Sequence, residues 1–157
     1  MTKKKILITG AAGFLGFYLS KVLLNEEYTV VGLDNLNNYY DVKLKYSRLN
    51  ILGINVSSIN YGEQIKNSTG KNFSFIKLNL EDKKSLIKLF ENEKFSEMSD
   101  KRKNEIRKFD IGFIFQEFHL IPVLSAQENV EYFLIRQNLS KEEIAVRTKE
   151  ALMAVGL

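Results

Sequence analysis

Short apolar runs in the first half of the chain predict buried β-strands. Each run consists mainly of aliphatic, β-branched or aromatic residues and ends in glycine or polar residues, which is typical of strands covered on both faces. These runs occupy residues 4–9, 29–34 and 73–78. The polar, glycine-bearing stretch at 53–71 predicts mostly loop.

Helical periodicity follows each of these runs. Apolar residues recur every three or four positions from Phe14 onward, over 41–52 and over 82–95, as one face of an amphipathic helix requires. The side chains in register on these faces are Leu15, Leu19, Val22 and Leu23, then Leu44, Arg48, Leu49 and Leu52, then Leu86, Leu89 and Phe90. Alternating strands and helices predict an α/β fold with right-handed crossovers.

The pattern changes after residue 95. Residues 96–108 are almost entirely polar, and the apolar run at 110–115 predicts a fourth strand. The stretches "SAQE" (125–128) and "SKEE" (140–143) are capping boxes, so each predicts the start of a helix, the first running to about Asn138 and the second ending at Gly156. The expected fold is a three-layer Rossmann-like sandwich with a mainly parallel sheet of about four strands and C-terminal helices.

Composition excludes several classes of site. The chain has 157 residues, net charge +4, a single histidine and no cysteine, which excludes disulfides and thiolate metal sites and argues against a histidine-based triad. The basic stretch at 100–108 lacks interleaved aromatic residues, so a solvated helix face is expected rather than a nucleic-acid site. No apolar run reaches the ~18 residues of a membrane span, and the N-terminus predicts a strand rather than a signal peptide. The expected compartment is the cytoplasm, with no metal and no membrane insertion.

The stretch "TGAAGFLG" carries the clearest chemistry. Gly10, Gly13 and Gly16 lie between a predicted strand and a predicted helix, and Asp34 ends the next strand. This spacing suits a dinucleotide: Gly10 permits the tight turn, Gly13 the approach of a pyrophosphate, and Gly16 close packing of the helix. A carboxylate at Asp34 can accept hydrogen bonds from both ribose hydroxyls and would repel the 2′-phosphate of NADP.

Residues 4–95 resemble the NAD-dependent epimerase/dehydratase family of extended short-chain dehydrogenases, with the closest likeness to its UDP-glucuronate 4-epimerase branch. The resemblance lies in "ILITGAAGFLGFYLSKVLL", "VVGLDNLNNYYDVKLKYSRL" and "NFSFIKLNLEDKKSLIKLFENEKF". It implies NAD as cofactor. The contacts it implies are Gly10, Gly13, Phe14 and Leu15 at the pyrophosphate, Asp34, Asn35 and Asn38 at the ribose and nearby phosphate, and Asn79 and Leu80 at the adenine.

The catalytic part of that family is not matched. Its chemistry uses a Tyr-xxx-Lys pair far downstream of the glycine motif, where the tyrosine removes a proton as hydride moves to the nicotinamide. The Tyr-xxx-Lys formed by Tyr39 and Lys43 lies at the adenosine end, and we interpret it as coincidence. No catalytic residue is therefore expected.

Residues 97–157 resemble a different family, the ATP-binding subunits of ABC transporters of the lipoprotein-release and macrolide-export type. The stretch "IGFIFQEFHLIPVLSAQENV" resembles the Q-loop region, which makes Gln116 the Q-loop glutamine, and "KEALMAVGL" resembles the helix before the signature motif. A GxxxxGK[ST] loop, a signature motif and a Walker B acid are absent, so Gln116 is expected to sense no nucleotide and His119 to have no catalytic role.

These observations predict a chimeric, non-catalytic α/β protein with a residual, weakened NAD(H) site. Residues 1–95 would form the epimerase-like half, and 96–157 an ABC-like fragment packed on it as one domain. Three alternatives stay open: a structural protein without ligand, a working NAD-dependent sugar-nucleotide epimerase, and a module associated with an ABC transporter. The sequence leaves the oligomeric state open.

Overall fold

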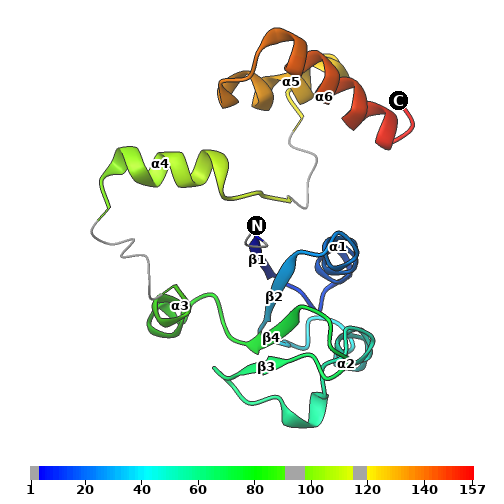
Figure 1. Ribbon diagram of the computed structural model, residues 1–157, viewed down its shortest axis with the longest axis vertical. Helices are drawn as coiled ribbons and strands as arrows, with labels where there is room; N and C mark the ends of the chain where they lie inside the picture. Colours follow the sequence, from blue (N-terminus) through cyan, green and yellow to red (C-terminus); the bar gives the residue numbers. More distant parts are fainter. Residues whose placement is uncertain (1–3, 91–97, 115–119) are drawn as a thin grey trace. The chain divides into compact units, whose positions relative to one another are not determined.

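The computed structural model describes residues 4–90, 98–114 and 120–157 (Figure 1). The chain divides into two compact units, Met1–Glu93 and Lys94–Leu157. The packing of 96–157 on the first half as one domain stays a prediction.

The first unit is built on a four-stranded sheet. Its strands lie in the order β1 (Lys5–Thr9), β2 (Thr29–Asp34), β4 (Phe73–Lys77) and β3 (Gln64–Lys66). β1, β2 and β4 run parallel, and β3 pairs antiparallel with β4. The three strands expected from the apolar runs are confirmed, as is the mainly parallel sheet.

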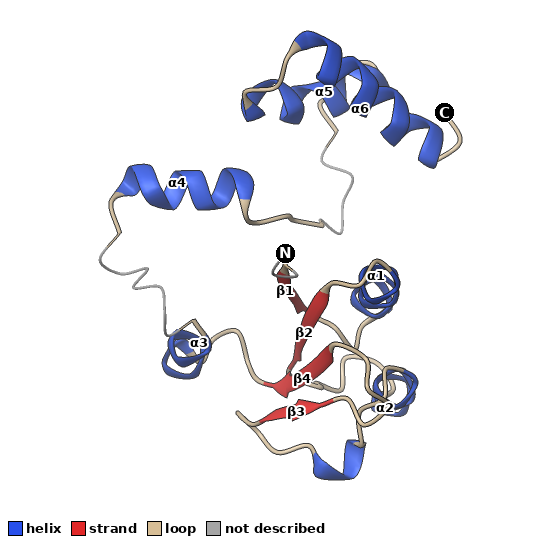
Figure 2. Ribbon diagram, in the orientation of Figure 1, coloured by secondary structure: helices blue, strands red, loops and turns tan. Residues whose placement is uncertain are grey.

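Helices cover both faces of this sheet (Figure 2). α1 (Phe14–Asn25) and α2 (Val42–Ile51) lie on one face, and α3 (Lys83–Leu89) lies on the other. Alternate strand residues point to opposite faces: Val30 and Phe75 belong to the larger core cluster, whereas Val31 and Ile76 belong to the cluster joined by residues of α3. The three-layer α/β fold expected from the sequence is confirmed.

The buried faces of the first two helices differ from those expected. α1 buries Phe17 and Ser20. Of its four expected residues, Leu23 packs against the core, while Leu15, Leu19 and Val22 are exposed. The helix is apolar around most of its circumference, so apolar spacing alone does not select a face. The Ser20 hydroxyl donates to the carbonyl of Gly16 at 2.7 Å, so this polar side chain is satisfied within the helix although it is fully buried.

The face expected for α2 is confirmed at Leu49 and Leu52, which are buried in the core, but not at Leu44. Lys45 and Leu49 are its buried residues, and Leu44 is half exposed. Lys45 and Leu49 are four positions apart and therefore share one face. Lys45 was not among the residues expected on this face, and its long aliphatic stem allows a lysine to be buried there.

The stretch 53–71 is mostly loop, as expected, with two short regular elements in it. It holds a short 3₁₀ helix, η1 (Val56–Ser58), and the edge strand β3. The amide of the Gln64 side chain donates to the Ser74 hydroxyl at 2.6 Å, so polar residues help fix this edge. A strand covered on one face at a sheet edge needs few apolar residues, and the single inward apolar side chain, Ile65, gives no periodicity to detect.

The strand expected at 110–115 is wrong for the residues described. Ile111–Ile114 adopt no regular secondary structure, and Phe115 lies outside the described residues. A strand needs a neighbour to satisfy its backbone hydrogen bonds. In residues 98–114 and 120–157 the second unit contains helices and no strand that could pair with this run.

The second unit contains α4 (Asp100–Phe109), α5 (Ala126–Leu134), η3 (Ile135–Gln137) and α6 (Lys141–Ala154). Both expected capping boxes are confirmed, at Ser125 and at Ser140. Gly156 has φ +80° just after the C-cap of α6 and donates its amide to the carbonyl of Met153, as expected for a terminating glycine. Across the described ranges, no helix has both the length and the apolar character that a bilayer span requires.

The second capping box predicts a pH dependence. Hydrogen bonds from the backbone and hydroxyl of Ser140 lower the pKa of the Glu143 carboxyl below its ordinary value. A lowered pKa means that the carboxylate stabilises α6 above the pKa of the unfolded chain and that this stabilisation is lost as pH falls through the folded pKa. We expect an NMR titration to show the pKa of Glu143 rising part of the way toward its ordinary value in Ser140→Ala, because the hydroxyl is lost but the backbone amide of residue 140 still donates. An unchanged pKa would contradict this.

Candidate functional site

The glycine turn connects β1 to α1. Gly10 has φ +66°, a left-handed backbone conformation that favours glycine, and its carbonyl accepts from the amide of Gly13 at 2.8 Å. Gly13 is the N-cap of α1. A Cβ added to Gly16 would contact the backbone of Gly10 and Ala11. Gly16 therefore permits close packing of the helix on the turn itself, rather than only on the sheet as its spacing suggested.

The carboxylate of Asp34 ties the end of β2 to this turn. Asp34 is buried, and its Oδ2 accepts from the amide of Ala12 at 3.2 Å. Its Oδ1 accepts from the amide of Leu36 at 2.8 Å, which holds Leu36 at φ +55°. Because Asp34 lies at the carboxyl end of a parallel strand, it faces the crevice in which open α/β sheets bind ligands.

Lys45 lies beside this carboxylate. Its Nζ is 3.3 Å from Oδ1 of Asp34 and donates to Oδ1 of Asn37 at 2.9 Å. Both members of the ion pair have side chains that are only 5% exposed. A buried lysine is tolerated because the carboxylate and the amide oxygen replace its water ligands. The expectations from the sequence did not include Lys45 among the site residues.

Arg48 joins α2 to the glycine turn from the same side. Its Nη1 donates to the carbonyl of Ala12 at 3.2 Å and to the hydroxyl of Tyr40 at 3.1 Å. The guanidinium also lies over the rings of Phe14 and Tyr40, at 5.9 and 5.8 Å from their centroids. The arrangement places a permanent positive charge near the N-terminus of α1.

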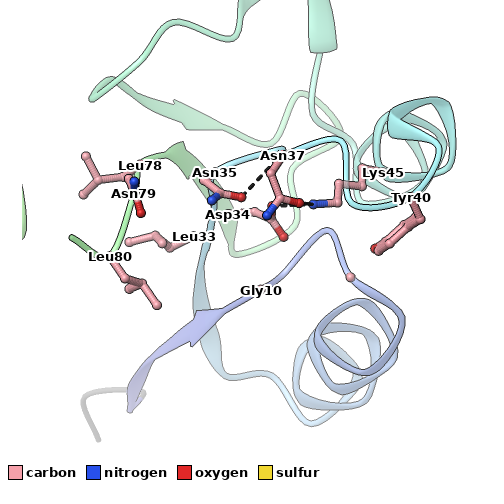
Figure 3. A pocket seen from close by; sticks show the side chains of 11 residues that line it. Gly10, Leu33, Asp34, Asn35, Asn37, Tyr40, Lys45, Leu78, Asn79 and Leu80 are labelled. Carbon is pink, nitrogen blue, oxygen red and sulfur yellow. Dashed lines mark hydrogen bonds and ion pairs between the residues drawn. The ribbon is translucent and has the colours of Figure 1, made fainter. Parts of the chain in front are cut away.

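A pocket of about 290 Å³ opens where these elements meet (Figure 3). Figure 3 shows Lys45 reaching from α2 toward Asn37 and Asp34, with Leu78, Asn79 and Leu80 on the segment that follows β4. The lining residues are Gly10, Gly13, Leu33, Asp34, Asn35, Asn37, Tyr40, Lys45, Leu78, Asn79 and Leu80. The volume is at the lower end for ligand pockets, which suits one half of a dinucleotide better than the whole.

The structure gathers part of the expected site into this pocket. Six expected residues line it: Gly10, Gly13, Asp34, Asn35, Asn79 and Leu80. The other four described ones, Phe14, Leu15, Gly16 and Asn38, are not among its lining residues. Phe14 and Leu15 are more than half exposed at the start of α1. The assignment of all ten residues to NAD binding stays a prediction.

The segment after β4 is held by a small polar network. The amide of Asn79 donates to the hydroxyl of Tyr61 at 3.3 Å, and Oδ1 of Asn79 accepts from the amide of Glu81 at 3.3 Å. Hydrogen bonds from the backbone and hydroxyl of Ser85 lower the pKa of the Asp82 carboxyl, the N-cap of α3. Since Asp82 caps a helix, its lowered pKa has a structural explanation.

The Tyr-xxx-Lys pair noted in the sequence does not contribute to the pocket. Tyr39 is 89% exposed, and neither Tyr39 nor Lys43 is among the lining residues. Within the described residues, no group of three or more His, Cys, Asp or Glu side chains could hold a metal ion. Gln116 and His119 lie outside the described residues.

The sheet order and the turn between β1 and α1 define a Rossmann-like α/β protein. The chain belongs to the NAD dependent epimerase/dehydratase family, whose model matches residues 6–98, more than half of the chain. The resemblance inferred from the sequence is thereby confirmed.

Two relatives of this kind each match slightly more than half of the chain. An uncharacterized 37.6 kDa protein in the cld 5′ region of Escherichia coli O111:H- is 43% identical over 86 residues, which are 55% of this chain and 21% of that protein. A UDP-glucuronate 4-epimerase of Thermodesulfobacterium geofontis is 39% identical over 85 residues, 54% of this chain and 22% of the epimerase. The chain thus spans about a fifth of the length of these relatives.

The second resemblance is also confirmed. An uncharacterized ABC transporter ATP-binding protein of Thermotoga maritima is 44% identical over 69 residues, which are 44% of this chain and 30% of that protein. Another, YvrO of Bacillus subtilis, is 51% identical over 53 residues, 34% of this chain and 23% of that protein. Relatives from two unrelated families therefore match parts of one chain.

Proposed function

We propose that this chain is a non-catalytic chimera whose epimerase-like unit retains a binding site for the adenosine half of NAD(H). One observation carries the proposal: Asp34 at the end of β2 and the turn at Gly10 meet at one pocket, as the dinucleotide-binding motif requires. All lining residues, from Gly10 to Leu80, lie within residues 6–98, the part that matches the epimerase family.

The residues present fit an adenosine diphosphate group. An added Cβ at Gly10 would have no atom within 4 Å, so the space beside this turn is open to a ligand. The amides at the start of α1 and the guanidinium of Arg48 favour an anion there, and Asp34 and Asn35 offer acceptors to ribose hydroxyls. Leu33, Leu78 and Leu80 provide apolar lining for a base.

The second part of the proposal, that the chain is non-catalytic, is supported by the position of Tyr39. When bound, NAD would supply hydride transfer, but the epimerase reaction also needs a base positioned at the sugar. Tyr39 is the tyrosine of the only Tyr-xxx-Lys spacing noted in the sequence, and it is exposed to solvent rather than directed into the pocket. The family match favours a working sugar-nucleotide epimerase, but the pocket supplies no support for one from the Tyr39 and Lys43 spacing.

Calorimetric titration with ADP-ribose and with NADH tests the proposal. We expect saturable binding of both ligands with similar affinities, because the pocket accommodates only the half that they share. Asp34→Ala should weaken both by roughly 10- to 100-fold, since hydrogen bonds to charged groups contribute about 1.5–3 kcal/mol.

A matched control is Glu26→Ala, which removes an exposed carboxylate at the far end of α1. This variant should bind like the wild type. Thermal melts of all three proteins establish that each is folded. A wild-type chain that melts cooperatively but binds neither ligand would contradict the proposal and favour a structural protein without ligand.

A further inference from the structure

Lys45 is the one lysine that lines the pocket, within the residues described, and it is almost completely buried. Its ammonium group has three donors, of which one reaches Asp34 and one reaches Asn37. The ring of Tyr40 lies 5.1 Å from Nζ and covers the cation from one side. The ammonium group is therefore held in place at the wall of the pocket by two hydrogen bonds and one aromatic ring.

The ion pair changes what Asp34 means for ligand choice. A lone carboxylate at the end of β2 would repel a 2′-phosphate. Here the charges of Asp34 and Lys45 cancel at 3.3 Å, and Arg48 adds a further positive charge at the neighbouring turn. The repulsion between Asp34 and a 2′-phosphate is thus offset by Lys45, which lies in the same wall of the pocket. The preference between a free and a phosphorylated ribose depends on the pair, not on the carboxylate alone.

We propose that Lys45 is a specificity-determining residue of this pocket: paired with Asp34 it serves a ribose with a free 2′-hydroxyl, and released from Asp34 it serves a 2′-phosphate. The inference rests on the proposed function, because it concerns the same adenosine site. In the paired state Asp34 accepts from a ribose hydroxyl while Lys45 donates to an oxygen of the same ribose. Without the carboxylate, a 2′-phosphate becomes the counter-ion of a buried cation.

The test compares ADP-ribose with 2′-phospho-ADP-ribose by calorimetry, so that no contact to nicotinamide is needed. The wild type should prefer ADP-ribose. Asp34→Asn should shift the ratio of the two dissociation constants toward the phosphorylated ligand by about 10-fold or more, the value of one charge-assisted hydrogen bond. In the double variant Asp34→Asn/Lys45→Met most of this shift should vanish. A shift that is equally large without Lys45 would overturn the inference.

Substitution of Lys45 alone tests the same inference if the Asp34→Asn variant fails to fold. Lys45→Met leaves Asp34 without its lysine partner and should increase the preference for ADP-ribose by about 10-fold. Lys43→Met removes an exposed lysine from the same helix and is the matched control. An unchanged ratio in a folded Lys45→Met variant would show that the lysine only supports the structure.

The outcomes separate the two proposals. If the folded wild type binds neither ligand, the proposed adenosine site is wrong and the inference falls with it. If it binds ADP-ribose with a preference that does not respond to Lys45, the site exists and only the inference is wrong. Melting temperatures of each variant, with and without ligand, give a second readout that does not depend on binding heat.

Discussion

Replacing Gly16 by alanine is expected to destabilise the first unit by about 3 kcal/mol, at the upper end of the cost of overpacking. The added Cβ would contact the carbonyl group of Gly10 and the Cα of Ala11. These are backbone atoms of a turn that is already fixed by the hydrogen bond from Gly13 to Gly10 and by Asp34. They cannot move aside as a flexible side chain would, so the turn must open.

Urea unfolding followed by far-UV circular dichroism measures this loss of stability. The Gly16→Ala protein should also lose affinity for ADP-ribose, because the opened turn no longer borders the pocket. Gly112→Ala is the control, since a Cβ at Gly112 would have no atom within 4 Å and its φ is not in the left-handed region. A Gly16→Ala variant as stable as Gly112→Ala would mean that α1 does not pack on the turn as described.

Replacing Phe75 by alanine is expected to cost about 3–5 kcal/mol, the range for deleting a large aromatic side chain from a core. Phe75 is fully buried in β4, and it belongs to the cluster that joins the sheet to α1 and α2. The surrounding strands are fixed on both sides by their backbone ladders, so the cavity cannot collapse easily.

Tyr39→Ala is the control for this second experiment. Tyr39 is 89% exposed, so its removal should change the free energy of unfolding by less than about 0.5 kcal/mol. Equilibrium unfolding in urea gives the free energy of unfolding of each variant. The two values are compared where both transitions depend equally on urea concentration. A cost near 1 kcal/mol for Phe75→Ala would place this ring outside the core.

The sequence predicted the strands of the first unit better than the faces of its helices. Strands such as 29–34 are buried on both sides, so every residue contributes to the same apolar signal. A helix that is apolar almost all round, like α1, contains no such information about its inner face. That face is set by tertiary contacts, here by Gly16 and Ser20, which a count of apolar positions overlooks.

Half of the pocket was accessible to sequence reasoning. Gly10, Gly13 and Asp34 carry a spacing that has a chemical reason. No such spacing identifies Lys45 or Tyr40. Both reach the pocket only because the segment after β2 folds back toward the glycine turn. One signal was present: counting back four positions from Leu49 on the buried face of α2 gives Lys45, and a lysine on a buried face needs a partner.

Two segments show what local patterns omit: the strand expected at 110–115, and the short strand β3 inside a stretch that is otherwise loop as expected. Residues 110–114 have the composition of a strand but, in the part of the second unit that the structure describes, no strand to pair with. Residues 64–66 have a polar composition but a ready partner in β4. Strand formation thus follows the availability of a ladder more closely than it follows composition.

The order of the sheet also has a consequence for the behaviour of the protein in concentrated solution. In the described part of the first unit, β1 pairs only with β2, so its outer edge presents unpaired backbone groups along the apolar stretch Lys5–Thr9. Such an edge is a template for strands of other molecules. Lys4 and Lys5 are exposed at its beginning, and their charges repel an approaching copy. Because salt screens that repulsion, colloidal stability in this unit rests on ionic strength as well as on folding.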